Sequence, residues 1–246
     1  MNAQVSTVII IPSYNETLAL PELLRELKLG LMKQDAVIVV DDSPPETSLE
    51  IKRLCLESID DCEFDFRFDQ SGGKSGRGAA VRRGMVLAIS EFPNLEKVLE
   101  CDADGSHRPV DILQIKNSLS SADLLVGSRY LSSSKIVGWP VTRRAFSWFL
   151  NRSIPRATGV NLQDITNGLR RYSKAAVGKV LSEKQTNKGF IYLSEQAILI
   201  SRAGMAISEE PIIFVDRTLG RSTVTWREIS TSLYGIFQLV IANRKA

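Results

Sequence analysis

The chain has 246 residues, enough to bury a sizeable core as one α/β domain or two small ones. Apolar residues make up 43% and charged residues 24%, which excludes the low-hydrophobicity composition of disordered chains. The net charge of +3 fits anionic ligands or an anionic membrane surface, but no dense basic run is interleaved with aromatic residues, so nucleic-acid binding has little support.

β-branched runs alternate with helical patterns through the first half of the chain. This alternation predicts a mostly parallel sheet flanked by helices, and the continuous apolar strands suit burial on both faces. In such a sheet, ligands bind beyond the carboxyl ends of the strands. The expected strands are residues 7–11, 36–40, 63–68 and 97–101, and the expected helices are residues 20–31, 48–58, 79–89 and 109–119.

The second half of the chain has no repeat and no composition break, so we expect a single domain over residues 1–246. A strand at 123–127 leads through a polar connector at 132–135 to an amphipathic helix near 143–154. The remaining expected elements are helices near 174–181 and 193–203, a strand at 206–215 and an amphipathic helix from about 226 to 241.

The cysteines and the first residues indicate a reducing compartment. Three cysteines form no CxxC pair, and the N-terminal run enters a strand pattern without a basic-then-apolar signal segment. The longest apolar stretches fall well short of the roughly 18 residues that a membrane span needs. We therefore expect a cytoplasmic protein without a transmembrane helix.

The acidic motif Asp102-Ala103-Asp104 follows the strand at 97–101 directly. Two carboxylates on one side of a turn can bind Mg²⁺ or Mn²⁺ that also touches a diphosphate. Such a metal neutralises the charge on a departing nucleoside diphosphate. An isolated Asp-x-Asp is more often a solvated turn, but the strand before it and two similar polar loops after other strands favour the metal site.

Asp41 and Asp42 follow the strand at 36–40. They can accept hydrogen bonds from the base or ribose of a nucleotide, as an acidic residue does at the same edge of dinucleotide-binding sheets. The alternative is that they cap or turn the chain into the next helix.

The glycine-rich stretch at 72–78 contains Gly-Lys-Ser but is not a Walker A loop, because Phe68 stands where the first glycine is required. We expect a flexible loop that enters the helix at 79–89. Its amides, with Lys74 or Arg77, are candidates for contact with phosphate.

His107 is the only histidine, which excludes Ser-His-Asp and multi-histidine zinc chemistry. We expect it on a surface loop, with an approach to the metal as the alternative. Several arginines lie beside glycines or strand ends, where their fixed fork of donors suits phosphate, although each alone also fits ordinary surface charge. They are Arg129, Arg143, Arg144, Arg170, Arg171, Arg217 and Arg221.

The order of these motifs resembles the inverting family 2 glycosyltransferases of GT-A (Rossmann-like) fold, and among them the polyprenyl-phosphate (dolichyl-phosphate) mannose synthases. The resemblance extends from about residue 6 to 240. It is carried by PSYNE at 12–16, VVDDSP at 39–44, DAD at 102–104, GSRY at 127–130, GWP at 138–140 with Arg143, DITNGLR at 164–170, EPI at 210–212 and FVDR at 214–217.

The resemblance implies transfer of a sugar, mannose from GDP-mannose, to a polyprenyl phosphate at the cytoplasmic face of a membrane. It places nucleotide binding in about residues 1–125 and acceptor binding in about residues 126–246. By the same resemblance, the guanosine end is held by Pro12, Tyr14, Glu16, Val40 and Asp42. The metal and the diphosphate are contacted by Asp102, Ala103 and Asp104. The lipid phosphate is received by Arg129 and Arg143, and Arg217 closes over the donor.

Two positions depart from the family pattern. Ser106 stands where the family has a glutamine that binds the metal, which leaves Ser106, His107 or water to complete the shell. Thr223 stands where the family tends to have lysine, and Arg221 is close enough in sequence to compensate. Two alternatives therefore stay open: a transferase using another donor such as UDP-glucose or another acceptor, and a non-catalytic nucleotide-binding protein.

A lipid phosphate is mostly anionic at pH 7, since the second pKa of a phosphate monoester is about 6, and it needs no general base. Asp104, Arg129 and Arg143 are then expected to act by positioning and charge. The lipid tail requires docking at a membrane surface, through the helix at 226–241 or the segment around Trp139 and Trp148. Packing against the core is the alternative for the C-terminal helix.

Overall fold

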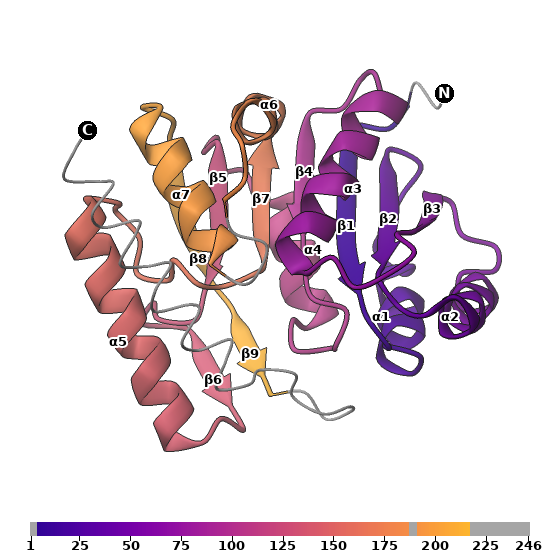
Figure 1. Cartoon of the computed structure of the whole chain (residues 1–246), viewed down its shortest axis with the longest axis horizontal. Helices are drawn as coiled ribbons and strands as arrows, with labels where there is room; N and C mark the ends of the chain where they lie inside the picture. The colour runs from indigo at the N-terminus through magenta and orange to yellow at the C-terminus, as the bar shows by residue number, and fades with distance from the viewer. Residues whose placement is uncertain (1–3, 187–190, 217–246) are drawn as a thin grey trace.

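The computed structural model describes residues 4–186 and 191–216 (Figure 1). Helices and strands alternate along the chain, as the sequence predicts. Their bounds are β1 (Thr7–Ser13), α1 (Ala19–Leu27), β2 (Asp35–Asp41), α2 (Pro45–Ser58), β3 (Asp65–Gln70), α3 (Arg77–Glu91), β4 (Lys97–Glu100), α4 (Pro109–Asn117), β5 (Leu124–Ser128), β6 (Lys135–Val137), α5 (Val141–Thr158), β7 (Arg170–Ser173), α6 (Lys174–Ser182), α7 (Tyr192–Arg202), β8 (Ile207–Pro211) and β9 (Ile213–Val215).

Within the described part of the chain, seven strands form one central sheet in the order β3-β2-β1-β4-β7-β5-β8. Only β7 runs against its neighbours: it pairs antiparallel with both β4 and β5, whereas the other pairings in this sheet are parallel. The predicted mostly parallel sheet is therefore confirmed. Strands from before and after residue 125 share it, so the division into a nucleotide half and an acceptor half stays a prediction.

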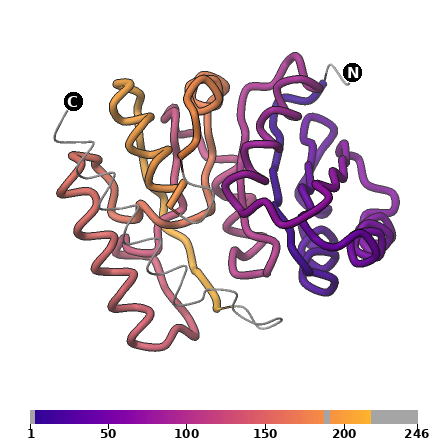
Figure 2. Tube along the Cα trace, viewed as in Figure 1, coloured from indigo at the N-terminus to yellow at the C-terminus, as the bar shows by residue number. Residues whose placement is uncertain are grey.

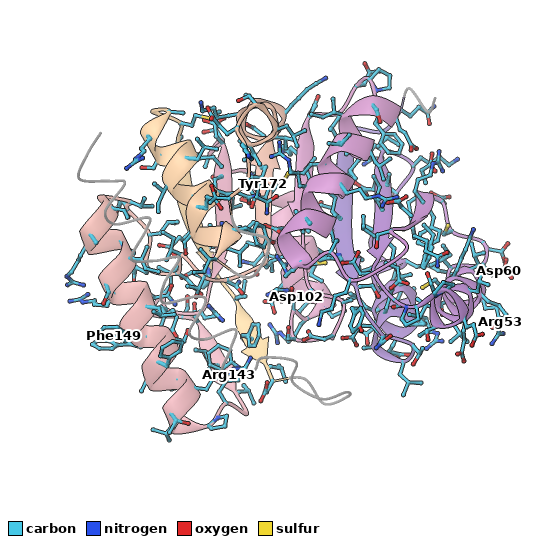
Figure 3. The ribbon with its side chains drawn as sticks, in the orientation of Figure 1. Arg53, Asp60, Asp102, Arg143, Phe149 and Tyr172 are labelled. Carbon is cyan, nitrogen blue, oxygen red and sulfur yellow. The ribbon has the colours of Figure 1, made fainter. Side chains whose placement is uncertain are left out.

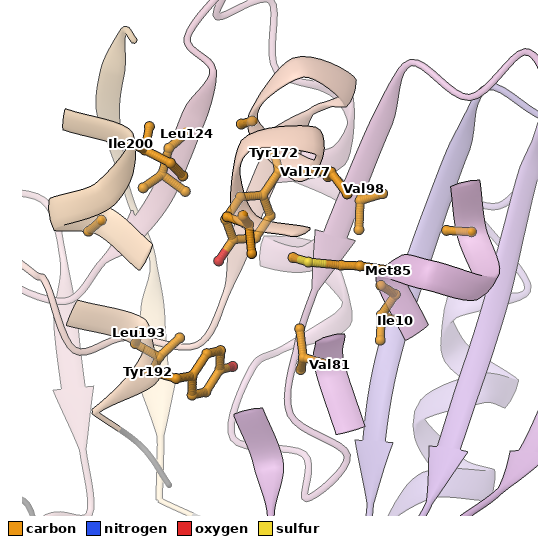
Figure 4. Packing of buried hydrophobic residues seen from close by; sticks show 14 of the residues in the cluster. Ile10, Val81, Met85, Val98, Leu124, Tyr172, Val177, Tyr192, Leu193 and Ile200 are labelled. Carbon is orange, nitrogen blue, oxygen red and sulfur yellow. The ribbon is translucent and has the colours of Figure 1, made fainter. Parts of the chain in front are cut away.

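Helices cover both faces of the sheet (Figures 1 and 2). Alternate residues of β1 belong to different cores, one on each face. Val8 and Ile10 of β1 belong to the core beneath α3, α6 and α7, part of which is shown in Figure 4. Ile9 and Ile11 belong to the second core, beneath α1, α2 and α4. The buried strands β1 and β2 are thus apolar throughout because both of their faces are covered.

The strand predicted at 206–215 is two strands. β8 pairs with β5 in the central sheet, whereas β9 pairs with β6 in a separate two-stranded parallel sheet. The chain leaves the central sheet at Pro211, which has no amide proton to continue the hydrogen bonds of β8. β6 itself lies partly in the segment predicted as a polar connector, since it begins at Lys135.

β7 was not predicted, because its sequence RRYS shows no apolar run. Arg170 and Arg171 are nevertheless buried. Arg170 donates hydrogen bonds to the carbonyls of Asn167 and Leu193, and Arg171 donates to Ser118 at the end of α4. Both interpretations offered for these two arginines, surface charge and phosphate ligand, are wrong: they satisfy backbone carbonyls inside the protein.

The predicted helix at 226–241 lies outside the described residues, as do Arg217, Arg221 and Thr223. Within residues 4–186 and 191–216, every helix is too short or too polar to cross a bilayer.

Candidate active site at the carboxyl edge of the sheet

The loops after β1, β2 and β4 meet at one edge of the sheet. The amide of Asp42 donates to the Ser13 carbonyl at 2.9 Å, and the amide of Asn15 donates to Ser43 Oγ at 2.8 Å. The amide of Cys101, just before the acidic motif, donates to Ile10 at 3.2 Å. The three polar segments that the sequence placed at a common edge therefore adjoin one another.

The residues predicted to hold the guanosine end lie along this edge. Pro12 and Val40 are direct neighbours in the β1–β2 register, and Tyr14 and Glu16 follow β1 in the next turn. Lys74 Nζ lies 4.7 Å from the centre of the Tyr14 ring, within the range of a cation–π interaction. The structure brings these residues together, and their contact with a nucleotide stays a prediction.

Asp42 anchors the glycine-rich loop. Its carboxylate accepts hydrogen bonds from Ser71 Oγ at 2.5 Å and from the amides of Ser75 and Gly76 at 2.8 and 3.1 Å. Gly76 has φ of +94°, a conformation that favours glycine at the start of α3. Two of the amides proposed as phosphate donors are thus bound to Asp42, which shapes the loop that borders the site.

The acidic motif follows β4, and its two carboxylates have different surroundings. The Asp102 side chain is 23% exposed and lies between Arg77 and His107. Asp104 accepts a hydrogen bond from the amide of Ser106 at 3.0 Å across a turn at Gly105, where φ is +75°. Ala103 between them is buried. Figure 3 places Asp102 at the end of β4, near the middle of the molecule.

His107 is fully buried, so its expected place on a surface loop is wrong. The amide of Asp102 donates to His107 Nδ1 at 3.1 Å, and His107 Nε2 lies 3.0 Å from Asn167 Oδ1. Because Nδ1 accepts, Nε2 carries the proton and donates to Asn167. Nδ1 therefore holds the backbone of the motif and Nε2 holds the Asn167 side chain, so neither ring nitrogen is available to a metal.

Arg77 lies beneath the acidic motif, where its guanidinium donates to protein groups, and its contact with phosphate stays a prediction. Its Nε donates to Asp102 Oδ1 at 2.7 Å and its Nη1 donates to Glu100 at 2.9 Å. Burial raises the pKa of Asp102, but the charge of Arg77 and its hydrogen bond to the carboxylate outweigh burial and lower that pKa to about 2. Asp102 is thus a carboxylate at any physiological pH. The sequence does not predict the ion pair between Glu100 and Arg77, because 23 residues separate the two.

The oxygen atoms at this edge fit a divalent cation whose remaining ligands come from a diphosphate and water. Asp102 and Asp104 supply hard oxygen donors, and Mg²⁺ is commonly held by one or two carboxylates, water and substrate phosphates. Among the described residues, no group of three or more His, Cys, Asp or Glu side chains can hold a metal ion, so this part of the chain offers no closed cage. Ser106 Oγ is buried and has no hydrogen-bond partner within residues 4–186 and 191–216, and its role as a ligand stays a prediction.

Arg129, predicted to receive the acceptor, is held in place by a buried carboxylate. Its Nε and Nη2 donate to the two oxygens of Asp164 at 2.7 and 2.8 Å. The charge of Arg129 outweighs the effect of burial and lowers the pKa of Asp164. The guanidinium carbon also lies 5.1 Å from the ring centre of Trp139 and 5.3 Å from that of Phe214.

Arg143 comes to the same group of aromatic residues from the start of α5. Its guanidinium carbon lies 4.2 Å from the Trp139 ring centre, and its Nη1 donates to Asp216 at 2.8 Å. Figure 3 shows Arg143 beside β9 at this end of α5. The two predicted acceptor arginines therefore flank one tryptophan, while Arg217 lies outside the described residues.

A cavity of about 690 Å³ opens beside Arg129, between β6 and α5. Apolar side chains form much of its wall, and arginines stand among them. Its lining includes Arg129, Tyr130, Ile136, Val141, Arg144 and Trp148.

The sequence matches the family model for glycosyl transferase family 2 over residues 8–181. The chain is 30% identical to an undecaprenyl-phosphate mannosyltransferase of Micrococcus luteus over 236 residues, which cover 96% of this chain and 94% of that protein. It is 28% identical to a polyprenol monophosphomannose synthase of Mycolicibacterium smegmatis, with coverage of 97% and 88%.

Solved structures share the fold at low sequence identity. A glucosyl-3-phosphoglycerate synthase of M. tuberculosis matches with a TM-score of 0.62 at 15% identity, over 97% of this chain and 80% of that chain. A mannosyltransferase from Pyrobaculum calidifontis, solved in complex with GDP-Man and Mn²⁺, matches with a TM-score of 0.60 at 16% identity, over 96% and 64%. The fold is the GT-A fold, and with a family model matching more than half of its length, the chain belongs to glycosyl transferase family 2.

Proposed function

We propose that this glycosyltransferase transfers mannose from GDP-mannose to a polyprenyl phosphate. The names of the two relatives from Micrococcus luteus and Mycolicibacterium smegmatis support a polyprenyl-phosphate acceptor and a mannosyl group. The mannosyltransferase of similar fold, solved with GDP-Man and Mn²⁺, is compatible with this donor.

The cavity between β6 and α5 is the observation that carries the proposal. A polyprenyl phosphate has a dianionic head and a hydrocarbon tail. The cavity offers Arg129 and Arg144 beside the apolar side chains of Ile136, Val141 and Trp148. Arginine binds phosphate oxygens with a fixed fork of donors, and the apolar wall suits the first units of the chain. A soluble sugar acceptor would leave this apolar wall without a use.

The reaction needs alignment and charge neutralisation more than proton transfer. A phosphate oxygen of the acceptor attacks the anomeric carbon, the bond from that carbon to the donor diphosphate breaks, and the electron pair leaves on the nucleoside diphosphate. The configuration at the carbon inverts. In this scheme Arg129 and Arg144 in the cavity, with Arg143 from the start of α5, orient the acceptor phosphate, which is already ionised. Asp102 and Asp104 would hold Mg²⁺ or Mn²⁺, which supplies a Lewis acid for the leaving diphosphate.

A panel of donors tests the proposal. Purified protein is incubated with labelled GDP-mannose, GDP-glucose or UDP-glucose and with undecaprenyl phosphate in detergent, with Mg²⁺, Mn²⁺ or EDTA. We expect lipid-linked mannose from GDP-mannose alone, and loss of product in EDTA. Product from UDP-glucose but not from GDP-mannose would overturn the donor, and nucleotide binding without transfer from any donor would favour the non-catalytic alternative.

We also propose that α5 docks on an anionic membrane surface. The helix carries four arginines and no acidic residue, and it exposes Val141, Trp148 and Phe149 by 81%, 56% and 55%. Figure 3 shows Phe149 pointing away from the sheet. A cationic helix with exposed aromatic side chains is typical of interfacial binding. It would bring the acceptor cavity, which α5 lines, to the lipid.

Removing the two aromatic side chains tests this docking. The variant Trp148→Ala/Phe149→Ala is expected to bind vesicles containing anionic lipid at least tenfold more weakly in a sedimentation assay, because exposed aromatic area is lost from the interface. The matched control is Leu49→Ala/Leu56→Ala, which removes exposed apolar side chains from α2 at the opposite end of the molecule (Figure 1). Equal loss in both variants would contradict docking through α5.

A further inference from the structure

The guanidinium of Arg77 lies directly against the acidic motif on its buried side. It begins α3, and its single guanidinium donates to two carboxylates, Asp102 and Glu100. The Arg77 side chain is only 10% exposed. A positive charge therefore already lies against Asp102 when no metal is bound.

Glu100 keeps Arg77 in this position. Glu100 is fully buried, and its carboxylate accepts hydrogen bonds from the hydroxyls of Tyr172, at 2.6 Å, and Tyr192. Figure 4 shows both tyrosines within the packed core beneath α3, α6 and α7. Because separating a buried pair leaves an uncompensated charge, Arg77 cannot withdraw from Glu100 without a large cost.

Gly168 leaves the space that the guanidinium fills. Arg77 Nη2 donates to the Gly168 carbonyl at 3.2 Å, and a Cβ atom at position 168 would lie 2.5 Å from that nitrogen. The segment that carries Asp164 and Asn167 is therefore shaped around Arg77 at this point.

This fixed charge opposes a divalent cation at Asp102. Metal–oxygen distances are about 2 Å, and Arg77 Nε lies 2.7 Å from the same carboxylate, so a metal there is within several ångströms of the guanidinium. Two cations at that separation repel strongly even at an effective dielectric constant of about 20. The described residues offer no third acidic or histidine ligand to offset the repulsion.

We propose that Arg77 makes metal binding conditional on the diphosphate of the donor. Without nucleotide, the two carboxylates of the motif bind the cation weakly, because Asp102 is already paired with Arg77. The donor diphosphate adds the negative charge that offsets the repulsion from Arg77. The site then takes up metal and nucleotide together. This inference rests on the proposed function, since it takes Asp102 and Asp104 as the metal site of a nucleotide-sugar transferase.

The test compares two variants that differ only at Arg77. Glu100→Gln neutralises the buried carboxylate and keeps an oxygen to accept from the tyrosines, and Arg77→Leu/Glu100→Gln also removes the cation without leaving a buried charge unpaired. Mn²⁺ binding is titrated by electron paramagnetic resonance without nucleotide. We expect the double variant to bind Mn²⁺ at least tenfold more tightly than Glu100→Gln.

The coupling between metal and nucleotide gives a second measurement. The affinity for GDP is measured by calorimetry with and without Mn²⁺; by linkage, the tightening by Mn²⁺ equals the tightening of Mn²⁺ binding by GDP. This factor should fall about tenfold when Arg77 is removed. Circular dichroism confirms folding of each variant, and Arg77→Gln in the Glu100→Gln background replaces the leucine variant if that one does not fold.

Asp102→Asn in the double-variant background separates the two ways of failing. If it abolishes the Mn²⁺ binding but removal of Arg77 changes neither measurement, the role of Arg77 is overturned and the proposed metal site stands. If it leaves Mn²⁺ binding intact, Asp102 is not a ligand, and both the role of Arg77 and the proposed metal site fail.

Discussion

Replacing Asp104 by asparagine is expected to lower sugar transfer by about 10³-fold, the size of effect seen when one group that stabilises developing charge is removed. The change removes the negative charge that would hold the metal. It keeps an oxygen to accept the hydrogen bond from the Ser106 amide at 3.0 Å, so the turn at Gly105 should be preserved. Asp104 is the better position to test because replacing Asp102 also takes a partner from Arg77.

Transfer from GDP-mannose is measured at saturating Mn²⁺, with thermal unfolding as a check on the fold. The matched control is Asp60→Asn, an exposed aspartate at the end of α2, which should retain full activity and the same unfolding temperature. Full activity of Asp104→Asn would refute the acidic motif as the site. A large fall in its unfolding temperature would mean that the side chain is structural.

The strands that the sequence predicts well are those buried on both faces. β1 and β2 read as continuous apolar runs because helices cover both sides of the sheet, and the turns after them carry polar residues because they open at its edge. β7 is not predicted by such an apolar run, because its sequence is RRYS. Its arginines are tolerated in the interior only because carbonyls from distant segments, such as Leu193 and Ser118, accept their hydrogen bonds.

The sequence likewise predicts one part of the candidate site and not another. The edge of the sheet, the acidic motif and the arginines of the acceptor side follow from strand ends and from the family resemblance, and the structure brings the described ones to one region. The network beneath the motif does not follow from the sequence. His107 is buried because Asn167, 60 residues away, accepts from its ring, and Arg77 is turned inward by Glu100. Such pairings depend on tertiary contacts that local patterns do not encode.

Loss of Arg129 is expected to affect both stability and acceptor use. Arg129→Ala leaves the buried Asp164 carboxylate without its partner, which should cost about 3–5 kcal/mol of unfolding free energy. The double variant Arg129→Ala/Asp164→Asn removes both charges and should recover much of that loss. In the structure the backbone amide of residue 129 donates to the Asp164 side chain at 2.9 Å, and the side-chain oxygen of asparagine can still accept this bond. Urea unfolding of the two variants measures the difference.

The double variant then isolates the role of the arginine in catalysis. We expect kcat/KM for undecaprenyl phosphate to fall about 10- to 100-fold, which corresponds to the loss of one charge-assisted hydrogen bond of about 1.5–3 kcal/mol, while the affinity for GDP changes less than threefold. Asp164→Asn alone is the control that keeps the guanidinium. If the double variant uses the lipid as well as this control does, Arg129 only stabilises the fold, and the phosphate must be held by Arg143 or Arg144 on α5.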